Sequence, residues 1–426
     1  MWYFIRDKKS RDFFRFWFAQ LISQFGDRVY QMALVGLMTA LHPGSVMEMS
    51  KMFAFAIIPA FIIGPIAGVY IDRWDRRTTL FISYFVQSVL ILIVAFYLIH
   101  LPSIWPMYIG VFVISSLSCF YVPAKMSFIP EIVHKDDLHI ANSLSTITAM
   151  LAGGLGILLG SWIVEHTGFF AGFCWDTGCY FLSAALVFSI TAFQYRFPDK
   201  KMFIASTKEI LQAEKSVWHE IIDGIRYIRS QKEIRFIFWT MFILLAAVGA
   251  IYVVIIVFIQ QAFHSITKDL GLLAVSLTVG LFLGCLGYGR WGKKIAAYKV
   301  IFGSLILGGI MVVVFSCVVQ ATHDRFWALG LSFVLGLVVG PVMVAPNTVI
   351  NKLCAMEMSG KVFAAMNFVV YLAFLLAMMI SSFLSIHIDR LWILVGVGGI
   401  FMMVGLVGLL RSNKGEDSLV SQGAGS

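Results

Sequence analysis

The sequence predicts an all-α membrane protein that crosses the bilayer twelve times, in two groups of six helices. Of its 426 residues, 60% are hydrophobic and only 13% are charged. Soluble domains are about 45–50% apolar and about 25% charged, so this composition does not suit a soluble surface. The mean hydropathy is +0.88. Apolar segments of membrane-spanning length recur along the whole chain, and one long polar segment near the middle divides them.

Each predicted span is an apolar run long enough to cross the hydrocarbon core as a helix, which takes about 20 residues. Gly and Pro inside such runs are tolerated, because neighbouring helices can satisfy the backbone groups that they free. The twelve runs are 14–40, 48–71, 78–100, 104–124, 138–164, 170–194, 234–260, 269–289, 298–320, 325–346, 361–386 and 390–411.

The basic residues predict the orientation of the chain, because cytoplasmic connections carry an excess of Lys and Arg. They gather in the N-terminal arm and in the second-to-third and eighth-to-ninth connections. The connections 41–47, 101–106 and 165–170 contain neither Lys nor Arg. We therefore expect both termini in the cytoplasm.

A long polar connection, 195–233, separates an N-terminal six-helix bundle, 1–194, from a C-terminal one, 234–411. Within it, apolar residues recur at helical spacing, at Val217, Ile221, Ile222, Ile225 and Ile228. This pattern predicts an amphipathic helix on the inner membrane face. The polar segment 412–426, rich in small residues, is expected to be a disordered tail.

The two halves contain matching segments in the same order. The run DRWDRR, from Asp72 to Arg77, corresponds to GRWGKK, from Gly289 to Lys294. Pro123 ends the fourth span and Pro346 the tenth. Two such halves, related by an axis along the membrane normal, form a known transporter architecture with a substrate site between them at mid-depth.

The loop GVYIDRWDRR resembles the signature loop between helices two and three of the major facilitator superfamily. The matching residues are Gly68, Asp72, Arg73, Arg76 and Arg77. The resemblance implies the major facilitator fold and a cytoplasmic gate. In that gate Asp72 caps a helix of the other half, where a carboxylate is stabilised, and Arg73 and Arg77 complete a charge network. Gly289 replaces the Asp in the second copy, so the gate is expected on one side only.

Two branches of the superfamily share further stretches with this chain. GPIAGVYIDRWDRR and FIPEIVHKDDLHIANSL resemble the macrolide efflux proteins and the enterobactin exporter. AQLISQFGD and YVPAK resemble the bacterial lysophospholipid transporter instead. The first likeness implies export of a drug or siderophore, and the second implies movement of a lysophospholipid between leaflets.

Asp27 is predicted to lie near the middle of the membrane, about 17 Å along the first helix from Phe16 at 1.5 Å per residue. It belongs to a polar stripe formed by Gln20, Gln24, Asp27 and Gln31. A charge at that depth costs about 3 kcal/mol, so we expect the stripe to face the central cavity. Asp27 would then carry a proton or bind a cationic group. The alternative is that it pairs with a cation and only holds helices together.

Arg28 follows Asp27, and adjacent helix positions do not face each other. Glu165 and Asp176 are expected near the outer ends of helices five and six, which leaves no other acidic residue at mid-depth. Arg28 therefore suits an anionic substrate group, although bonds to nearby glutamines, or pairing with Asp27 through a bent helix, are alternatives.

Other spans are expected to line the same cavity by analogy with the superfamily. The candidates are Tyr121, Trp239, Tyr252 and Asn347. Aromatic residues at such positions more often serve packing than binding. The glycine-rich stretch AGGLGILLG, from Ala152 to Gly160, lies within a helix, so it predicts close helix packing and no phosphate loop.

Together these observations predict a secondary active transporter, not an enzyme. It would export an amphipathic, drug- or siderophore-like molecule by alternating access, driven by the proton gradient without cofactor or metal. The alternatives are a lysophospholipid transporter and a non-transporting membrane receptor or scaffold. The net charge of +9 is spread between apolar runs, so nucleic acid is not an expected partner. The bilayer and the substrate are, and the chain is expected to be a monomer.

Overall fold

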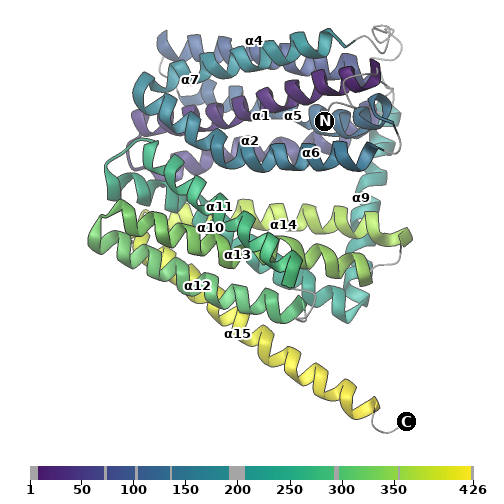
Figure 1. Cartoon of the computed structure of the whole chain (residues 1–426), viewed down its shortest axis with the longest axis vertical. Helices are drawn as coiled ribbons and strands as arrows, with labels where there is room; N and C mark the ends of the chain where they lie inside the picture. The colour runs from purple at the N-terminus through teal and green to yellow at the C-terminus, as the bar shows by residue number, and fades with distance from the viewer. Residues whose placement is uncertain are drawn as a thin grey trace. The chain divides into compact units, whose positions relative to one another are not determined.

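The described part of the chain consists of helices joined by short turns. A computed structural model of the whole chain describes residues 8–71, 74–100, 104–134, 137–190, 207–291, 297–353 and 356–423. In these ranges the apolar runs all form helices, which satisfy their own backbone hydrogen bonds as a lipid environment requires. Figure 1 shows the helices along the chain.

The described residues of the first half form eight helical elements. They are α1 (Lys8–Leu41), α2 (Val46–Ile62), α3 (Gly64–Ile71), α4 (Arg76–His100), α5 (Ile104–Ile132), α6 (Leu138–Leu151), the π-helix η3 (Ala152–Gly156) and α7 (Ile157–Phe188). Those of the second half form seven. They are α9 (Thr207–Ser230), α10 (Lys232–Phe263), α11 (Lys268–Trp291), α12 (Ala297–Thr322), α13 (Arg325–Leu353), α14 (Met356–Leu384) and α15 (Arg390–Gly423).

In the described residues, nine helical segments are long and apolar enough to cross a membrane. One of them, Leu138–Phe188, is 51 residues long and has a non-helical residue inside it, Gly168, with φ 83° and ψ 166°. Glycine adopts such a backbone without the steric penalty of a Cβ. The predicted fifth and sixth spans therefore meet at a turn of one residue. The all-helical membrane fold is confirmed, and the number twelve stays a prediction.

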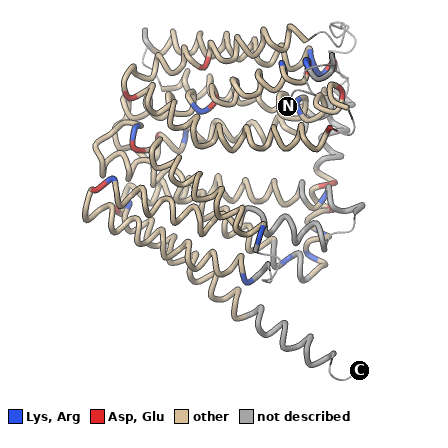
Figure 2. The backbone as a smooth tube through the Cα atoms, in the orientation of Figure 1, with Lys and Arg blue, Asp and Glu red and all other residues tan. Residues whose placement is uncertain are grey.

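The first two predicted spans are not among the nine. The α1 helix has 34 residues and carries charges along its length. The second span is divided into α2, which has 17 residues and contains Pro59, and the short α3. Figure 2 shows that most of the described backbone carries neither Lys, Arg, Asp nor Glu.

The chain separates into two compact units. Unit 1 contains Met1–Pro43, Lys51–Trp218 and Ile266–Gly271, and unit 2 contains Gly44–Ser50, His219–Ser265 and Leu272–Ser426. Each unit therefore includes one short segment from the other half of the sequence. The division falls inside α9, within the connection that the sequence predicts as a linker.

In unit 1, α1 packs along η3 and α7, while α4 packs against both α5 and α7. Glycines let α1 and α7 approach closely. A Cβ on Gly160 would lie 2.8 Å from Cα of Val29, and one on Gly172 would lie 2.9 Å from Cβ of Ala33. The close helix packing predicted for the Ala152–Gly160 stretch is therefore confirmed at Gly160.

In unit 2, α12 packs along α15, and α10 along α14. Glycines on α11 and α13 face the backbone of the opposite helix, so that an added Cβ would lie within 3.0 Å of it. They are Gly280, Gly284, Gly336 and Gly340. The last helix, α15, continues to Gly423 and so includes most of the segment that the sequence predicts as a disordered tail.

The amphipathic helix predicted in the linker is α9. Its Ile221, Gly224 and Ile228 are buried, and the Lys361 ammonium of α14 donates to Oδ2 of Asp223 at 3.1 Å. Ile222 and Ile225 are exposed, at 51% and 40%. The predicted apolar stripe is thus divided between a face packed in unit 2 and an exposed one.

Candidate functional site: a polar cluster inside unit 1

Asp27 lies at the centre of a polar cluster formed by four helices of unit 1. Its side chain is half-buried on α1, and its Oδ1 accepts a hydrogen bond of 2.5 Å from the hydroxyl of Tyr180 on α7. A carboxylate inside a membrane protein is stabilised by such a donor. The bond depends on the close approach of α1 and α7, because it joins their facing sides.

Three neighbouring hydroxyl groups form a series that begins on α1, the helix of Asp27. The Tyr84 hydroxyl on α4 lies 3.2 Å from the Ser23 hydroxyl on α1 and donates to the Tyr121 hydroxyl on α5 at 3.0 Å. The Tyr84 ring packs on the rings of Tyr121 and Tyr180, at centroid distances of 5.1 and 5.7 Å. The predicted site residue Tyr121 is therefore part of the same cluster as Asp27.

Two cations lie near the cluster. Arg28 and Lys125 both interact electrostatically with Asp27, and the Lys125 ammonium lies 5.8 Å from the centroid of the Tyr121 ring. In the described structure neither forms an ion pair with Asp27. Arg28 donates to Oε1 of Gln31 at 3.0 Å, which is one of the alternatives that the sequence left open. Sequence reasoning missed Lys125, although it belongs to the quoted YVPAK stretch.

Asp176 corrects one prediction. It was expected near the outer end of helix six, yet it is fully buried on α7, with Oδ1 facing the backbone of Gly26. A second acidic residue therefore lies beside Asp27. The turn at Gly168 starts the sixth span, and Asp176 lies about 12 Å beyond it at 1.5 Å per residue. The polar spacing of Asp176, Tyr180 and Ser183 was the available signal.

Helix packing covers part of the polar stripe on α1. Gln20 is fully buried, and its Oε1 accepts a hydrogen bond from the Ser145 hydroxyl of α6 at 3.2 Å. The expectation that the whole stripe faces a cavity is therefore wrong at Gln20, where helix packing covers the side chain. Gln24 is half-buried, and its Oε1 has no hydrogen-bond partner among the described residues.

Two other predicted site residues lie in unit 2. Trp239 is 53% exposed and packs on Phe238 and Phe242. Tyr252 packs on Phe374 of α14 with a centroid distance of 5.5 Å. Aromatic packing is the ordinary role for both. The side chain of Asn347 lies outside the described residues.

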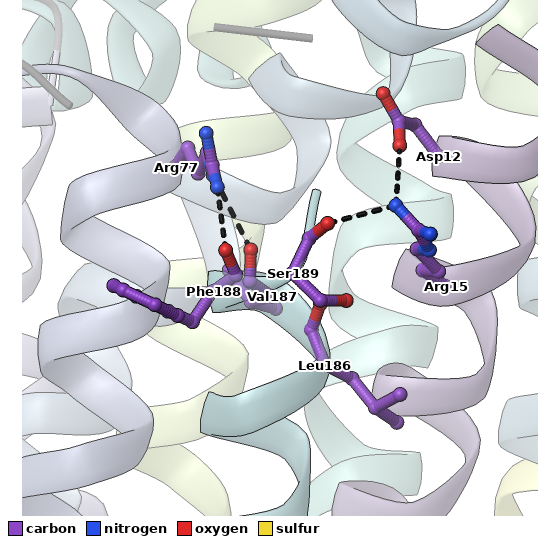
Figure 3. Close-up of polar contacts among 7 residues, drawn as sticks. All are labelled: Asp12, Arg15, Arg77, Leu186, Val187, Phe188 and Ser189. Carbon is purple, nitrogen blue, oxygen red and sulfur yellow. Dashed lines mark hydrogen bonds and ion pairs between the residues drawn. The ribbon is translucent and has the colours of Figure 1, made fainter. Parts of the chain in front are cut away.

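The predicted gate is described only in part, because Asp72, Arg73 and the surroundings of Gly68 lie outside the described residues. Arg77 is 3% exposed and donates to the carbonyls of Val187 and Phe188, at 3.3 and 2.7 Å (Figure 3). Those carbonyls end α7, where a helix leaves acceptors unsatisfied and favours positive charge.

Three further charged residues order the same region. Arg15 donates to the Ser189 carbonyl at 2.7 Å and to Asp12 at 3.3 Å (Figure 3). Arg76 forms an ion pair with Glu131. Asp75 caps the start of α4, where its Oδ2 accepts from the Thr78 backbone N–H at 2.8 Å. The signature loop thus fixes the ends of α4 and α7.

Glu165 caps the start of α11. Its carboxylate accepts hydrogen bonds from the backbone N–H groups of Thr267 at 2.7 Å and Lys268 at 3.1 Å. The Thr267 hydroxyl also donates to the Ser161 carbonyl at 2.9 Å. This contact holds the segment 266–271 in unit 1.

The fold and the cluster together define a class of protein. Ionisable groups are costly inside a membrane protein, and where they occur they mark transport paths. A multi-pass helical protein with such groups among its helices is therefore typical of a transporter.

Comparisons with known proteins agree. A sequence profile described as Major Facilitator Superfamily matches residues 16–378 and 237–424. The chain belongs to the Major Facilitator Superfamily and is a membrane transporter.

Similar proteins include the MFS-type transporter YfiS of Bacillus subtilis (strain 168), 23% identical, with 93% of this chain and 92% of that protein covered. Macrolide efflux protein A of Streptococcus pyogenes is also 23% identical, with 92% of both chains covered. Among solved structures, a bacterial homologue of the iron transporter ferroportin in an inward-facing state has a TM-score of 0.71. It is 11% identical, with 93% of this chain and 98% of that chain covered.

Proposed function

We propose that the protein is a proton-coupled exporter of an amphipathic, drug- or siderophore-like small molecule. It would work by alternating access in a bacterial inner membrane, with both termini in the cytoplasm, and perform no enzymatic reaction. Two macrolide efflux relatives that align along the chain support export. The observation that carries the coupling is Asp27, a half-buried carboxyl bonded to one hydroxyl inside a helical bundle.

Asp27 suits reversible proton binding because opposing effects act on it. Burial disfavours its charge, while Tyr180, Arg28 and Lys125 favour it. A group held between such effects changes protonation when its surroundings change. Movement of a neighbouring helix, or arrival of a charged substrate, would therefore release or bind a proton.

The two cations supply attraction for an acidic group on the substrate. The hydrogen bond that the structure gives the Arg28 side chain goes to a neutral partner, Gln31. The Lys125 ammonium lies 5.8 Å from the centroid of the Tyr121 ring, and it interacts with Asp27 without forming an ion pair among the described residues. A carboxylate, catecholate or phosphate on an otherwise apolar molecule would satisfy both charges.

The test is transport by purified protein in liposomes with an imposed pH gradient. We expect Asp27→Asn to abolish proton-driven uptake of a macrolide or siderophore into inverted vesicles, while exchange of substrate across the membrane continues. Asp324→Asn is the matched control, because Asp324 is an exposed acidic residue outside the cluster. Proton-driven transport that survives in Asp27→Asn at the parent rate would refute the coupling.

A lysophospholipid transporter is the second candidate, and one observation favours it. The two stretches that resemble the lysophospholipid transporter meet in this cluster, since Ser23 and Asp27 come from the first and Tyr121 and Lys125 from the second. A phosphodiester would suit the two cations.

A thermal-shift screen against lysophospholipids, siderophores and macrolides separates these substrate classes. Flux is then measured for every compound that stabilises the protein. Stabilisation by a ligand without flux would instead indicate a receptor. Arg28→Ala should weaken anionic ligands more than neutral ones, and an equal loss for both would contradict the anion site.

A further inference from the structure

Asp176 is an acidic side chain that the mechanism above does not use. It is 0% exposed, and neither carboxyl oxygen has a hydrogen-bond partner among the described residues. Its Oδ1 faces the backbone of α1 at Gly26, where an added Cβ would lie only 2.6 Å away. An unpartnered carboxyl is therefore packed against the residue that precedes Asp27.

The titratable groups that interact with Asp176 come from α1 and α7. They are Asp27, Tyr30, Cys179 and Tyr180. The nearby cations, Arg28 and Lys125, act on Asp27, and no cation of the described residues acts on Asp176. Its charged neighbour is thus another carboxyl.

Asp27 and Asp176 have different surroundings, and this difference gives the two carboxyls different proton affinities. Burial disfavours the charged form of Asp27, but a hydroxyl donor and two nearby cations oppose that effect. Among the described residues Asp176 has neither a hydrogen-bond donor nor a nearby cation, and an ionised carboxylate without partners in an apolar interior is very costly. When two such groups adjoin, the one in the apolar setting keeps the proton.

We propose that Asp176 is a second proton-binding carboxyl, which shares one proton with Asp27. In the arrangement described here Asp176 carries the proton and Asp27 is the carboxylate. Transfer breaks the O–H bond on Asp176, forms one on Asp27 and leaves the negative charge on Asp176. The half-buried Asp27 then releases the proton to water. The charge on Asp176 is unfavourable, so it takes up the next proton through Asp27.

Gly26 allows the Asp176 carboxyl to pack against α1 beside Asp27. A methyl group at this position would overlap Oδ1 of Asp176 and also lie 2.8 Å from Cβ of Cys179. Gly26→Ala should therefore push Asp176 away from α1 and weaken the sharing of the proton. The role in transport rests on the proton coupling proposed above, whereas the binding of the proton does not.

Infrared difference spectroscopy of the purified protein, taken in pH steps, tests the proton site directly. A protonated carboxyl shows a C=O stretching band that a carboxylate lacks. We expect Asp176→Asn to remove such a band that persists in the parent at neutral pH. Asp27→Asn should keep this band but change its dependence on pH, and Cys179→Ser should leave it unchanged. If Asp176→Asn does not fold, Asp176→Ser also removes the carboxyl.

The outcomes separate this inference from the proposed function. A parent band at neutral pH that survives in Asp176→Asn overturns the inference, as does a band whose titration ignores Asp27→Asn. Loss of the band together with slower proton-driven flux and preserved exchange supports both proposals. Suppose that the band changes in the variants as expected while a pH gradient drives no substrate flux in the parent protein. That result would support the proton site and refute the proposed coupling.

Discussion

Replacing Gly160 tests whether close packing of α1 on α7 positions the polar cluster. The nearest atoms to an added Cβ are backbone atoms of α1, with Cα of Val29 at 2.8 Å and O of Arg28 at 3.0 Å. Backbone atoms cannot move aside as the end of a flexible side chain can. Overpacking of this kind destabilises a protein by about 1–3 kcal/mol. The higher helix propensity of Ala relative to Gly offsets about 1 kcal/mol of this loss. We therefore expect Gly160→Ala to lower the free energy of unfolding by up to about 2 kcal/mol.

Gly178 provides the matched control on the same helix. It is exposed, and nothing lies within 4 Å of an added Cβ. Gly178→Ala should therefore stabilise the protein by up to about 1 kcal/mol, from propensity alone. The assay is unfolding of the purified protein by titration with a denaturing detergent, followed by circular dichroism. A Gly160→Ala protein as stable as Gly178→Ala would refute the reasoning.

Three further changes test other contacts. Arg77→Ala removes the guanidinium that donates to the Val187 and Phe188 carbonyls at a buried site, so thermal melting should show a loss of about 2–3 kcal/mol. Arg77→Lys should restore only part of it, and full recovery would contradict a role for the guanidinium geometry. Glu165→Gln should cost about 1–2 kcal/mol in the same assay, because an amide can accept but lacks the charge that suits a helix N-terminus; unchanged melting would argue against the cap. Tyr180→Phe removes the donor to Asp27, so it should alter the pH profile of transport while the melting temperature stays near that of the parent. An unchanged profile would show that the bond has no part in coupling.

The length and apolarity of segments made most of the fold predictable. The predicted span 78–100 corresponds to α4 (Arg76–His100), and 325–346 lies within α13 (Arg325–Leu353). These limits follow from composition, because polar residues and turns interrupt the apolar runs. The sequence also singled out Asp27, since a charge inside an apolar run is conspicuous.

The neighbours of Asp27 were harder to predict, because periodicity does not tell how one helix is rotated against the next. Asp176 was expected near a span end, yet the turn at Gly168 brings it beside Gly26. Lys125 lies beyond Pro123, the residue expected to end the fourth span, yet α5 continues through this proline to Ile132. Contacts between distant segments decide both positions.

The turn at Gly168 has a consequence for biosynthesis. Because one residue separates the two helical segments of 138–188, we expect them to enter the bilayer together as a hairpin. An acidic residue at mid-helix costs about 3 kcal/mol when its segment inserts alone. In a hairpin, the preceding apolar segment would favour insertion of the segment that contains Asp176. That segment therefore need not insert into the bilayer as an independent span.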